Sequence, residues 1–292
     1  MEYVIQNDEL AVRVSDRGAE LRSILCRADD RECLWQGLPQ IWPDRAPNLF
    51  PYIGRLTGGA YTYGGERYRL PIHGFAPTAD FTVVRQSPDS IAFELTDSAA
   101  TRAVYPFPFW LEIGYALEGS ALCTRYRVEN RGDGPMFFGL GGHPGIRVPL
   151  DDATEFEDWR VRFPQAAEPV RVGFTPDCFV SGEETPFPLA DGTDLPLRHD
   201  LFDDDAIVLR GAGSVVELVC PASPHSVRMD FGGFPYLGLW HWPKTDAPYV
   251  CLEPWSSLPA RAGVTEDLSV QPGLIRLEAG ERAERMWTIR IE

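Results

Sequence analysis

Short runs in which apolar and polar residues alternate recur along the whole 292-residue chain. In residues 122–129 the even positions carry Leu, Thr, Tyr and Val, whereas the odd positions carry Cys, Arg, Arg and Glu. A half-buried β-strand has this period of two, because successive side chains point to opposite faces of a sheet. Similar runs occupy residues 91–95, 215–220, 227–231 and 287–291. The alternation therefore predicts a chain built mainly from strands.

Turn-forming residues separate these runs. The chain contains 26 prolines and 27 glycines, and clusters such as Asn-Arg-Gly-Asp-Gly-Pro at 130–135 stand between neighbouring runs. No run has the spacing of an amphipathic helix longer than about two turns. No repeat period is present, which argues against a propeller or a β-helix. We predict an all-β fold in which two large antiparallel sheets form a β-sandwich.

The domain organisation depends on the polar, proline-rich stretch at residues 181–205. The alternating runs on both sides of this stretch are of the same kind, so it is interpreted as a long loop rather than a linker. β-Sandwiches often exceed about 200 residues as one unit. The prediction is a single domain over residues 1–292.

Charge and composition exclude several classes of partner. Asp and Glu number 43 against 27 Lys and Arg, which gives a net charge of −16. This charge repels nucleic acid and anionic membrane surfaces. The chain has no membrane-length apolar segment and no signal peptide at its start, so a cytoplasmic location is expected. The sequence is compatible with both a monomer and a homodimer.

The six cysteines form no C-x-x-C pair. This spacing argues against a zinc ribbon and against a redox motif. The thiols are expected to be reduced, and those inside apolar runs should pack as small hydrophobic groups.

One carboxylate breaks the apolar pattern. Glu253 follows Tyr-Val-Cys-Leu at 249–252 and precedes Pro and Trp. Charged groups are rarely buried unless they are paired or functional, and burial raises the pKa of a carboxyl group towards neutrality. Glu253 is therefore either a general base or a member of a hydrogen-bond network.

Three further ionisable residues stand beside glycine. Arg55 follows Gly54, His73 precedes Gly74, and His143 lies within Gly-Gly-His-Pro-Gly at 141–145. Glycines around a histidine remove side-chain bulk, as close approach of a ligand requires. Each residue also has a structural interpretation, as a surface arginine, a packed histidine or the cap of a turn.

Aromatic residues near Glu253 suggest a sugar ligand. Trp240, beside His241, and Trp255 could cover the apolar C–H faces of a sugar ring, while polar groups bind its hydroxyls. Core packing is the alternative for both tryptophans. Asp205 stands where an acidic loop enters an apolar strand, and a solvated loop is its alternative.

No local motif supports a metal or a cofactor. The histidines form no H-x-H or H-x-x-x-H pair, so no metal site is expected. The sequence also lacks the G-x-S-x-G elbow of hydrolases and the glycine-rich loops of nucleotide sites.

Four motifs together resemble the aldose 1-epimerase (galactose mutarotase) family. They are Phe-Pro-Tyr-Ile-Gly-Arg at 50–55, His-Gly-Phe at 73–75, Gly-His-Pro at 142–144 and Tyr-Val-Cys-Leu-Glu-Pro-Trp at 249–255. The resemblance covers most of the chain. It implies a supersandwich fold and cofactor-independent interconversion of the α and β anomers of a free aldose, with a monosaccharide as the partner.

The resemblance also implies roles for individual residues. Glu253 is similar to the base that takes a proton from the anomeric hydroxyl, and His143 to the acid that protonates the ring oxygen. Arg55 and His73 would bind hydroxyls and stabilise negative charge on oxygen, and Asp205 aligns with a hydroxyl-binding aspartate. Trp240 is the expected sugar-facing aromatic residue.

Departures from galactose mutarotases leave the sugar open. The Gly-His-Pro-Gly around His143 and the Phe after Gly74 resemble a divergent bacterial branch. A hexose-6-phosphate mutarotase and a non-catalytic carbohydrate-binding protein are the alternatives. A phosphate would need extra cations, for which Arg45 and Arg147 are the candidates. A glycosidase using Asp205 and Glu253 is a further reading.

Overall fold

The computed structural model of the chain describes residues 1–165 and 168–292. Within these residues nearly all regular structure is β-strand. One α-helix, α1 (Ala99–Val104), is capped by the Ser98 side chain. The 3-10 helices are η1 (Thr57–Gly59), η2 (Ala76–Thr78), η3 (Phe156–Asp158) and η4 (His199–Phe202). The prediction of an all-β chain is confirmed.

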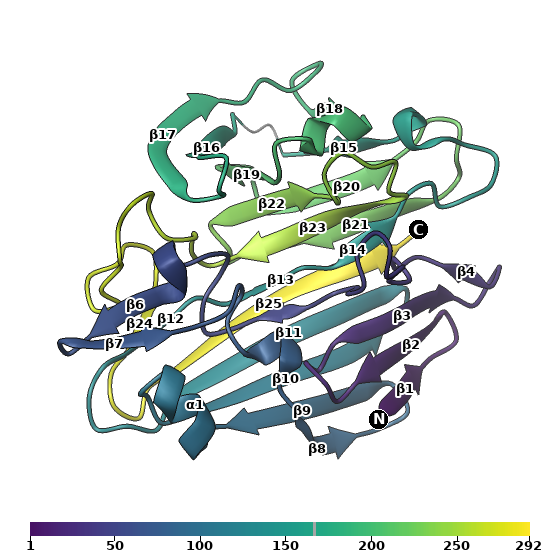
Figure 1. Cartoon of the computed structure of the whole chain (residues 1–292). Coiled ribbons are helices and arrows are strands. Elements are labelled where there is room, and N and C mark those ends of the chain that lie inside the picture. Colours follow the sequence, from purple (N-terminus) through teal and green to yellow (C-terminus); the bar gives the residue numbers. More distant parts are fainter. Residues whose placement is uncertain (166–167) are drawn as a thin grey trace.

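The largest sheet, here called the outer sheet, is antiparallel throughout and has nine strands in the described part of the chain. Figure 1 shows its yellow C-terminal strand β25 running between β21 and β11. In spatial order the strands are β18 (Asp194–Pro196), β15 (Arg160–Arg162), β20 (Val215–Val219), β21 (Ser226–Asp230), β25 (Arg282–Ile291), β11 (Ala121–Asn130), β10 (Phe109–Glu118), β9 (Ser90–Thr96) and β8 (Thr82–Gln86). Each alternating run named from the sequence lies in one of these strands.

The second large sheet, here called the site sheet, is also antiparallel. Its main path is β17 (Val180–Pro186), β16 (Val170–Phe174), β19 (Ile207–Arg210), β22 (Tyr236–Trp240), β23 (Tyr249–Trp255), β13 (Gly141–Gly142) and β5 (Asn48–Leu49). The short strand β14 (Gly145–Arg147) also pairs with β23. Both β13 and β14 therefore lie along the same edge of β23.

Three smaller sheets complete the regular structure of the described residues. The N-terminal sheet contains β1 (Glu2–Gln6), β2 (Leu10–Ser15), β3 (Leu21–Cys26) and β4 (Arg31–Glu32), drawn in purple in Figure 1. Two hairpin-like pairs are β6 (Ala60–Tyr63) with β7 (Glu66–Arg69), and β12 (Met136–Phe138) with β24 (Ile275–Leu277).

The two large sheets pack face to face through one extensive apolar core. The site sheet contributes Leu237, Leu239 and Leu252 to this core. The outer sheet contributes residues such as Tyr126 and Ile289. The alternation of side-chain directions along a strand explains this shared core, because every second residue of these strands faces the partner sheet. In β11 the even positions Leu122, Thr124, Tyr126 and Val128 are buried, as the sequence predicted.

The expectation of one long loop over residues 181–205 is wrong. Strand β17 begins at Val180 and pairs with β16, while β18 and η4 follow within the same stretch. β17 is an edge strand with mostly exposed residues. An edge strand tolerates polar side chains and a terminal proline because only one of its sides is paired. This is why its composition resembles that of a loop.

All six cysteines are free thiols. No helix among the described residues is long and apolar enough to cross a membrane.

Candidate active site

Strand β23 supplies the buried carboxylate. Every residue of this strand is buried, and Glu253 is only 1% exposed. Val250 and Leu252 belong to the main core, whereas Cys251 and Glu253 alternate with them and lie on the opposite face. The Trp255 indole donates a hydrogen bond to Glu253 Oε2 at 3.1 Å and fixes the orientation of the carboxyl group.

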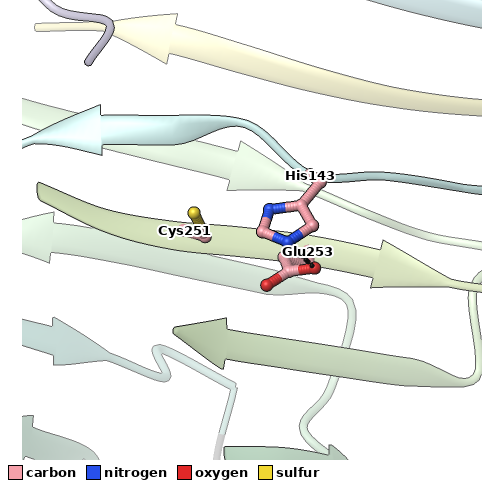
Figure 2. Close-up of side chains that lie close together, drawn as sticks. All are labelled: His143, Cys251 and Glu253. Carbon is pink, nitrogen blue, oxygen red and sulfur yellow. Dashed lines mark ion pairs between the residues drawn. The ribbon is translucent and has the colours of Figure 1, made fainter. Parts of the chain in front are cut away.

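The strand register brings His143 to Glu253. Gly141 pairs with Trp255 and Gly145 pairs with Cys251, so the residue midway between the glycines stands opposite Glu253. Directly opposed side chains of antiparallel strands are close neighbours. His143 Nε2 lies 3.3 Å from Glu253 Oε2. Figure 2 shows this contact, with His143 reaching to β23 from the segment between β13 and β14.

Burial shifts the pKa of both His143 and Glu253. Burial and the neighbouring His73 hold the pKa of His143 well below its usual range. Burial also raises the pKa of Glu253 well above its usual range, and the charge of Asp205 adds to this, while the Trp255 hydrogen bond opposes it. Both shifts act in favour of the uncharged form of each group, a neutral imidazole and a protonated carboxyl group. The pair then holds one transferable proton over two sites.

The structural reason for the glycines around His143 differs from the expected one. A Cβ on Gly142 would lie 2.9 Å from Trp287 Nε1, and one on Gly145 would lie 3.1 Å from Trp42. Protein side chains, rather than space for a ligand, occupy these positions. The glycines therefore allow tryptophans to pack against the His143 segment.

The six residues singled out from the sequence line one cavity of about 310 Å³. Its volume is in the range of small-molecule sites. The predicted residues in its lining are Arg55, His73, His143, Asp205, Trp240 and Glu253. Arg45 and Arg147 do not line it: Arg45 contacts Arg22 O and Gln36, and Arg147 pairs with Asp152.

Arg55 and His73 form one side of the cavity. Gly54 has a φ of 67°, and a Cβ there would lie 2.4 Å from Pro259, so only glycine suits this turn before Arg55. The Gly54 N–H donates to His73 Nδ1 at 3.1 Å, which leaves the proton of a neutral His73 on Nε2. Burial and the charge of Arg55 lower the pKa of His73 to about 4, so His73 is neutral at pH 7.

Asp205 is held at the cavity by two hydrogen bonds. Its Oδ2 accepts from the Cys178 thiol at 2.8 Å and its Oδ1 accepts from the Ala206 N–H at 2.8 Å. Its φ of 77° is unusual for a residue with a side chain. Burial and the Asp205 contact raise the pKa of Cys178 to about 11, so the thiol keeps its proton and acts as a donor.

Aromatic rings surround His143. Trp240 meets its imidazole edge to face at 5.3 Å between ring centres, and Trp42 lies at 5.0 Å. Trp42 and Cys178 were missed by the sequence argument, because neither stands in a polar pattern or near a recognised motif. His241 is buried away from the cavity lining, where its Nε2 contacts His199 Nδ1 at 3.2 Å.

Cys251 adds a third potential ligand atom to the pair formed by His143 and Glu253. One ligand atom each from His143, Cys251 and Glu253 lies within 4.8 Å of the others. Sequence reasoning found no such group, since it looked for histidines close in sequence, whereas the strand register joins distant segments. Figure 2 shows Cys251 two residues before Glu253 on β23.

Solved structures with the same sandwich are galactose mutarotase-like proteins. A galactose mutarotase related enzyme from Lactobacillus acidophilus is 35% identical with a TM-score of 0.94, covering 100% of this chain and 97% of that chain. A galactose mutarotase-like protein from Lactobacillus casei is 32% identical with a TM-score of 0.95, covering 100% of both chains. The fold thus defines a mutarotase-like protein.

The family follows from the sequence as well. The model of the aldose 1-epimerase family matches residues 1–273, and the chain belongs to this family. The plasmid-encoded protein LacX of Lactococcus lactis subsp. lactis is 28% identical over 300 residues, which cover 100% of this chain and 99% of LacX. The family resemblance read from the four motifs is confirmed.

Proposed function

We propose that the protein is an aldose 1-epimerase that interconverts the α and β anomers of a free, uncharged aldose. The observation that carries this proposal is the 3.3 Å contact between His143 Nε2 and Glu253 Oε2 inside the cavity. The anomeric hydroxyl and the ring oxygen of an aldose are bonded to the same carbon. An acid and a base that serve both oxygens must therefore be close neighbours, as His143 and Glu253 are.

The reaction runs through the open-chain aldehyde. Glu253 takes the proton of the anomeric hydroxyl while the C1–O5 bond breaks, and His143 gives a proton to the ring oxygen. Rotation about the C1–C2 bond presents the other face of the aldehyde. The ring oxygen then attacks C1 and returns its proton to His143, and Glu253 protonates the new anomeric oxygen.

The roles of Glu253 as base and His143 as acid need the carboxylate–imidazolium form of the pair. Transfer of one proton across the 3.3 Å contact produces this form from the neutral resting pair. A sugar hydroxyl that donates to Glu253 favours the carboxylate, because hydrogen bonding to a charged form stabilises it.

The remaining residues would bind and orient the sugar. Arg55 supplies a positive charge, and neutral His73 supplies an Nε2–H donor, for the oxygen on which negative charge develops. Asp205 would accept hydrogen bonds from hydroxyls. Trp42 and Trp240 offer apolar surface for the C–H face of the ring.

The charges around the cavity favour a neutral sugar over a phosphorylated one. Among the described residues that line it, Arg55 is the one arginine or lysine, and the carboxyl groups are Asp44, Asp204, Asp205 and Glu253. A phosphate carries nearly two negative charges at pH 7 and requires cationic partners. Arg45 and Arg147, the cations considered for this role, lie outside the lining.

Polarimetry tests the proposal directly. Freshly dissolved α-glucose and α-galactose should reach rotational equilibrium faster when the protein is added, and glucose 6-phosphate should respond much less. Turnover is proposed to need no metal or other cofactor, so a chelator should leave the rate unchanged. Saturable sugar binding without any acceleration would instead identify a non-catalytic carbohydrate-binding protein.

A further inference from the structure

We propose that His143, Cys251 and Glu253 form an inhibitory binding site for a thiophilic divalent cation such as Zn²⁺, which blocks the acid–base pair when it binds. The site is defined by geometry alone, whereas its inhibitory effect rests on the proposed function. The ion is not a cofactor here, because it would occupy the atoms between which the proton moves.

The spacing of the ligand atoms suits zinc. With zinc–ligand bonds of 2.0–2.3 Å and tetrahedral angles, two ligand atoms lie roughly 3.3–3.6 Å apart. His143 Nε2 and Glu253 Oε2 are already 3.3 Å apart. All three ligand atoms fall within 4.8 Å of one another. The largest shift needed to reach the spacing of zinc ligands is therefore about 1–1.5 Å, which is of the order of a side-chain rotation.

The backbone explains why the three groups converge. Cys251 and Glu253 are two residues apart on β23 and share one face, and His143 stands opposite Glu253 on the neighbouring edge. Hydrogen bonds hold both segments in place: the His143 N–H donates to Pro47 O at 3.0 Å and the Leu252 N–H donates to Pro144 O at 3.2 Å. The ligands are thus positioned by strand pairing rather than by mobile loops.

Charge balance favours a doubly charged cation. All three residues are buried, with Cys251 at 0% and His143 at 8% exposed. A buried ion has to be neutralised by its neighbours. A thiolate and a carboxylate neutralise one divalent cation, while the imidazole adds a neutral ligand. The set of one nitrogen, one sulfur and one oxygen selects zinc or cadmium over magnesium or calcium, which prefer oxygen ligands.

Few hydrogen bonds restrain the His143 ring. Its Nδ1 is buried and has no hydrogen-bond partner among the described residues. The imidazole therefore has no second hydrogen bond that would prevent it from turning towards an ion. The Trp255 hydrogen bond meanwhile orients the carboxyl group, as outer partners of metal ligands do.

Two of the three ligands border the cavity. His143 and Glu253 line it, whereas Cys251 is not among its lining residues. Three protein ligands and one open position are typical of a zinc site that exchanges water or a small molecule. A bound sugar and a bound ion would compete, since both need His143 and Glu253.

Zinc binding and mutarotation can be measured separately on the full-length protein, prepared metal-free with a non-chelating reductant. Zinc chloride should stop the acceleration of α-glucose equilibration, and a chelator should restore it, whereas magnesium and calcium chloride should have no effect. Cobalt chloride serves as a spectroscopic probe. It should bind one ion per chain with a thiolate-to-cobalt absorption band, and a saturating concentration of sugar should weaken this binding.

Two cysteine variants distinguish this site from adventitious binding. Cys251→Ala should keep the basal rate, lose the cobalt–thiolate band and need at least about 100-fold more zinc for inhibition, since loss of an outer partner alone typically costs 10–100-fold. Cys220→Ala removes another buried thiol, outside the cavity, and should behave like the wild type. If Cys251→Ala does not fold, the nearly isosteric Cys251→Ser replaces it.

Equal zinc inhibition of wild type and Cys251→Ala would overturn the proposal, and so would a cobalt–thiolate band that survives in Cys251→Ala. Failure of the enzyme assignment has a different signature. In that case the sugar assay would be inactive, while the cobalt band and its dependence on Cys251 would still be measurable.

Discussion

His143 Nε2 and Glu253 Oε2 lie 3.3 Å apart in direct contact, although they come from distant parts of the sequence. In the proposed mechanism the two residues exchange a proton across this contact and act as one unit rather than as two independent groups. Removal of either member should therefore affect the reaction more strongly than it affects the binding of the sugar.

Glu253→Gln tests this unit at the carboxyl group. The amide keeps the shape of the side chain but cannot accept the proton of the anomeric hydroxyl. We expect kcat to fall by about 10²–10⁴-fold, the usual contribution of a general acid or base, while sugar affinity by calorimetry changes little. The control is Glu112→Gln, a buried carboxylate of the outer sheet that pairs with Arg85 and Arg127. A wild-type rate in Glu253→Gln would remove this residue from the mechanism.

The pH dependence of kcat/KM should be bell-shaped. Activity needs one transferable proton on the pair. The lowered pKa of His143 places the acidic limb below 6.5, the ordinary value for histidine, because a second proton adds only there. The raised pKa of Glu253 places the alkaline limb above 4.5, the ordinary value for glutamate. An acidic limb found above 6.5 would contradict the burial argument.

Arg55→Ala should act mainly on binding. A hydrogen bond to a charged group contributes about 1.5–3 kcal/mol, so KM should rise roughly 10–100-fold, with a smaller change in kcat. Arg147→Ala is the matched control, because this arginine pairs with Asp152 outside the cavity. Equal effects of the two variants would show that Arg55 has no specific contact with the sugar.

The buried His241 should make the free energy of unfolding depend on pH, independently of catalysis. Burial lowers the pKa of His241 from 6.5 to about 4 in the folded protein. Between these values the unfolded chain binds a proton that the folded chain does not, so the free energy of unfolding falls as the pH falls from 6.5 through 4. Urea unfolding of His241→Gln should show a weaker fall over this range than the wild type. His225→Gln, at a partly exposed position, is the control for the loss of a histidine elsewhere in the chain.

The sequence predicted the strands well because alternation is a local signal. The run at 122–129 alternates between a core face and a solvent face, and it lies in β11. The same logic failed at residues 181–205, where the edge strand β17 is exposed and has no apolar face to reveal it. The single-domain organisation remains a prediction from the sequence.

Five of the six candidate residues were found because each carries an ionisable group in an unusual local setting, and Trp240 was found as an aromatic residue near Glu253. The structure brings all six to one cavity. Trp42 and Cys178 were missed as cavity-lining residues for the opposite reason, and so was Cys251 as a neighbour of His143 and Glu253. They look like ordinary hydrophobic residues in sequence, and only the strand register and the packing of distant segments bring them to the site.

The close packing of Trp287 against Gly142 ties the position of the His143 segment to the outer sheet. Trp287 belongs to the outer sheet, yet it fills the space where a side chain at position 142 would stand, immediately before His143. In the proposed mechanism the C-terminal strand would act as a spacer that sets the depth at which the imidazole meets the sugar. Gly142→Ala should displace this histidine and reduce kcat, and Trp287→Phe in the same chain should restore part of it. Variation in the final strand would then tune a reaction whose proposed acid and base belong to other segments of the chain.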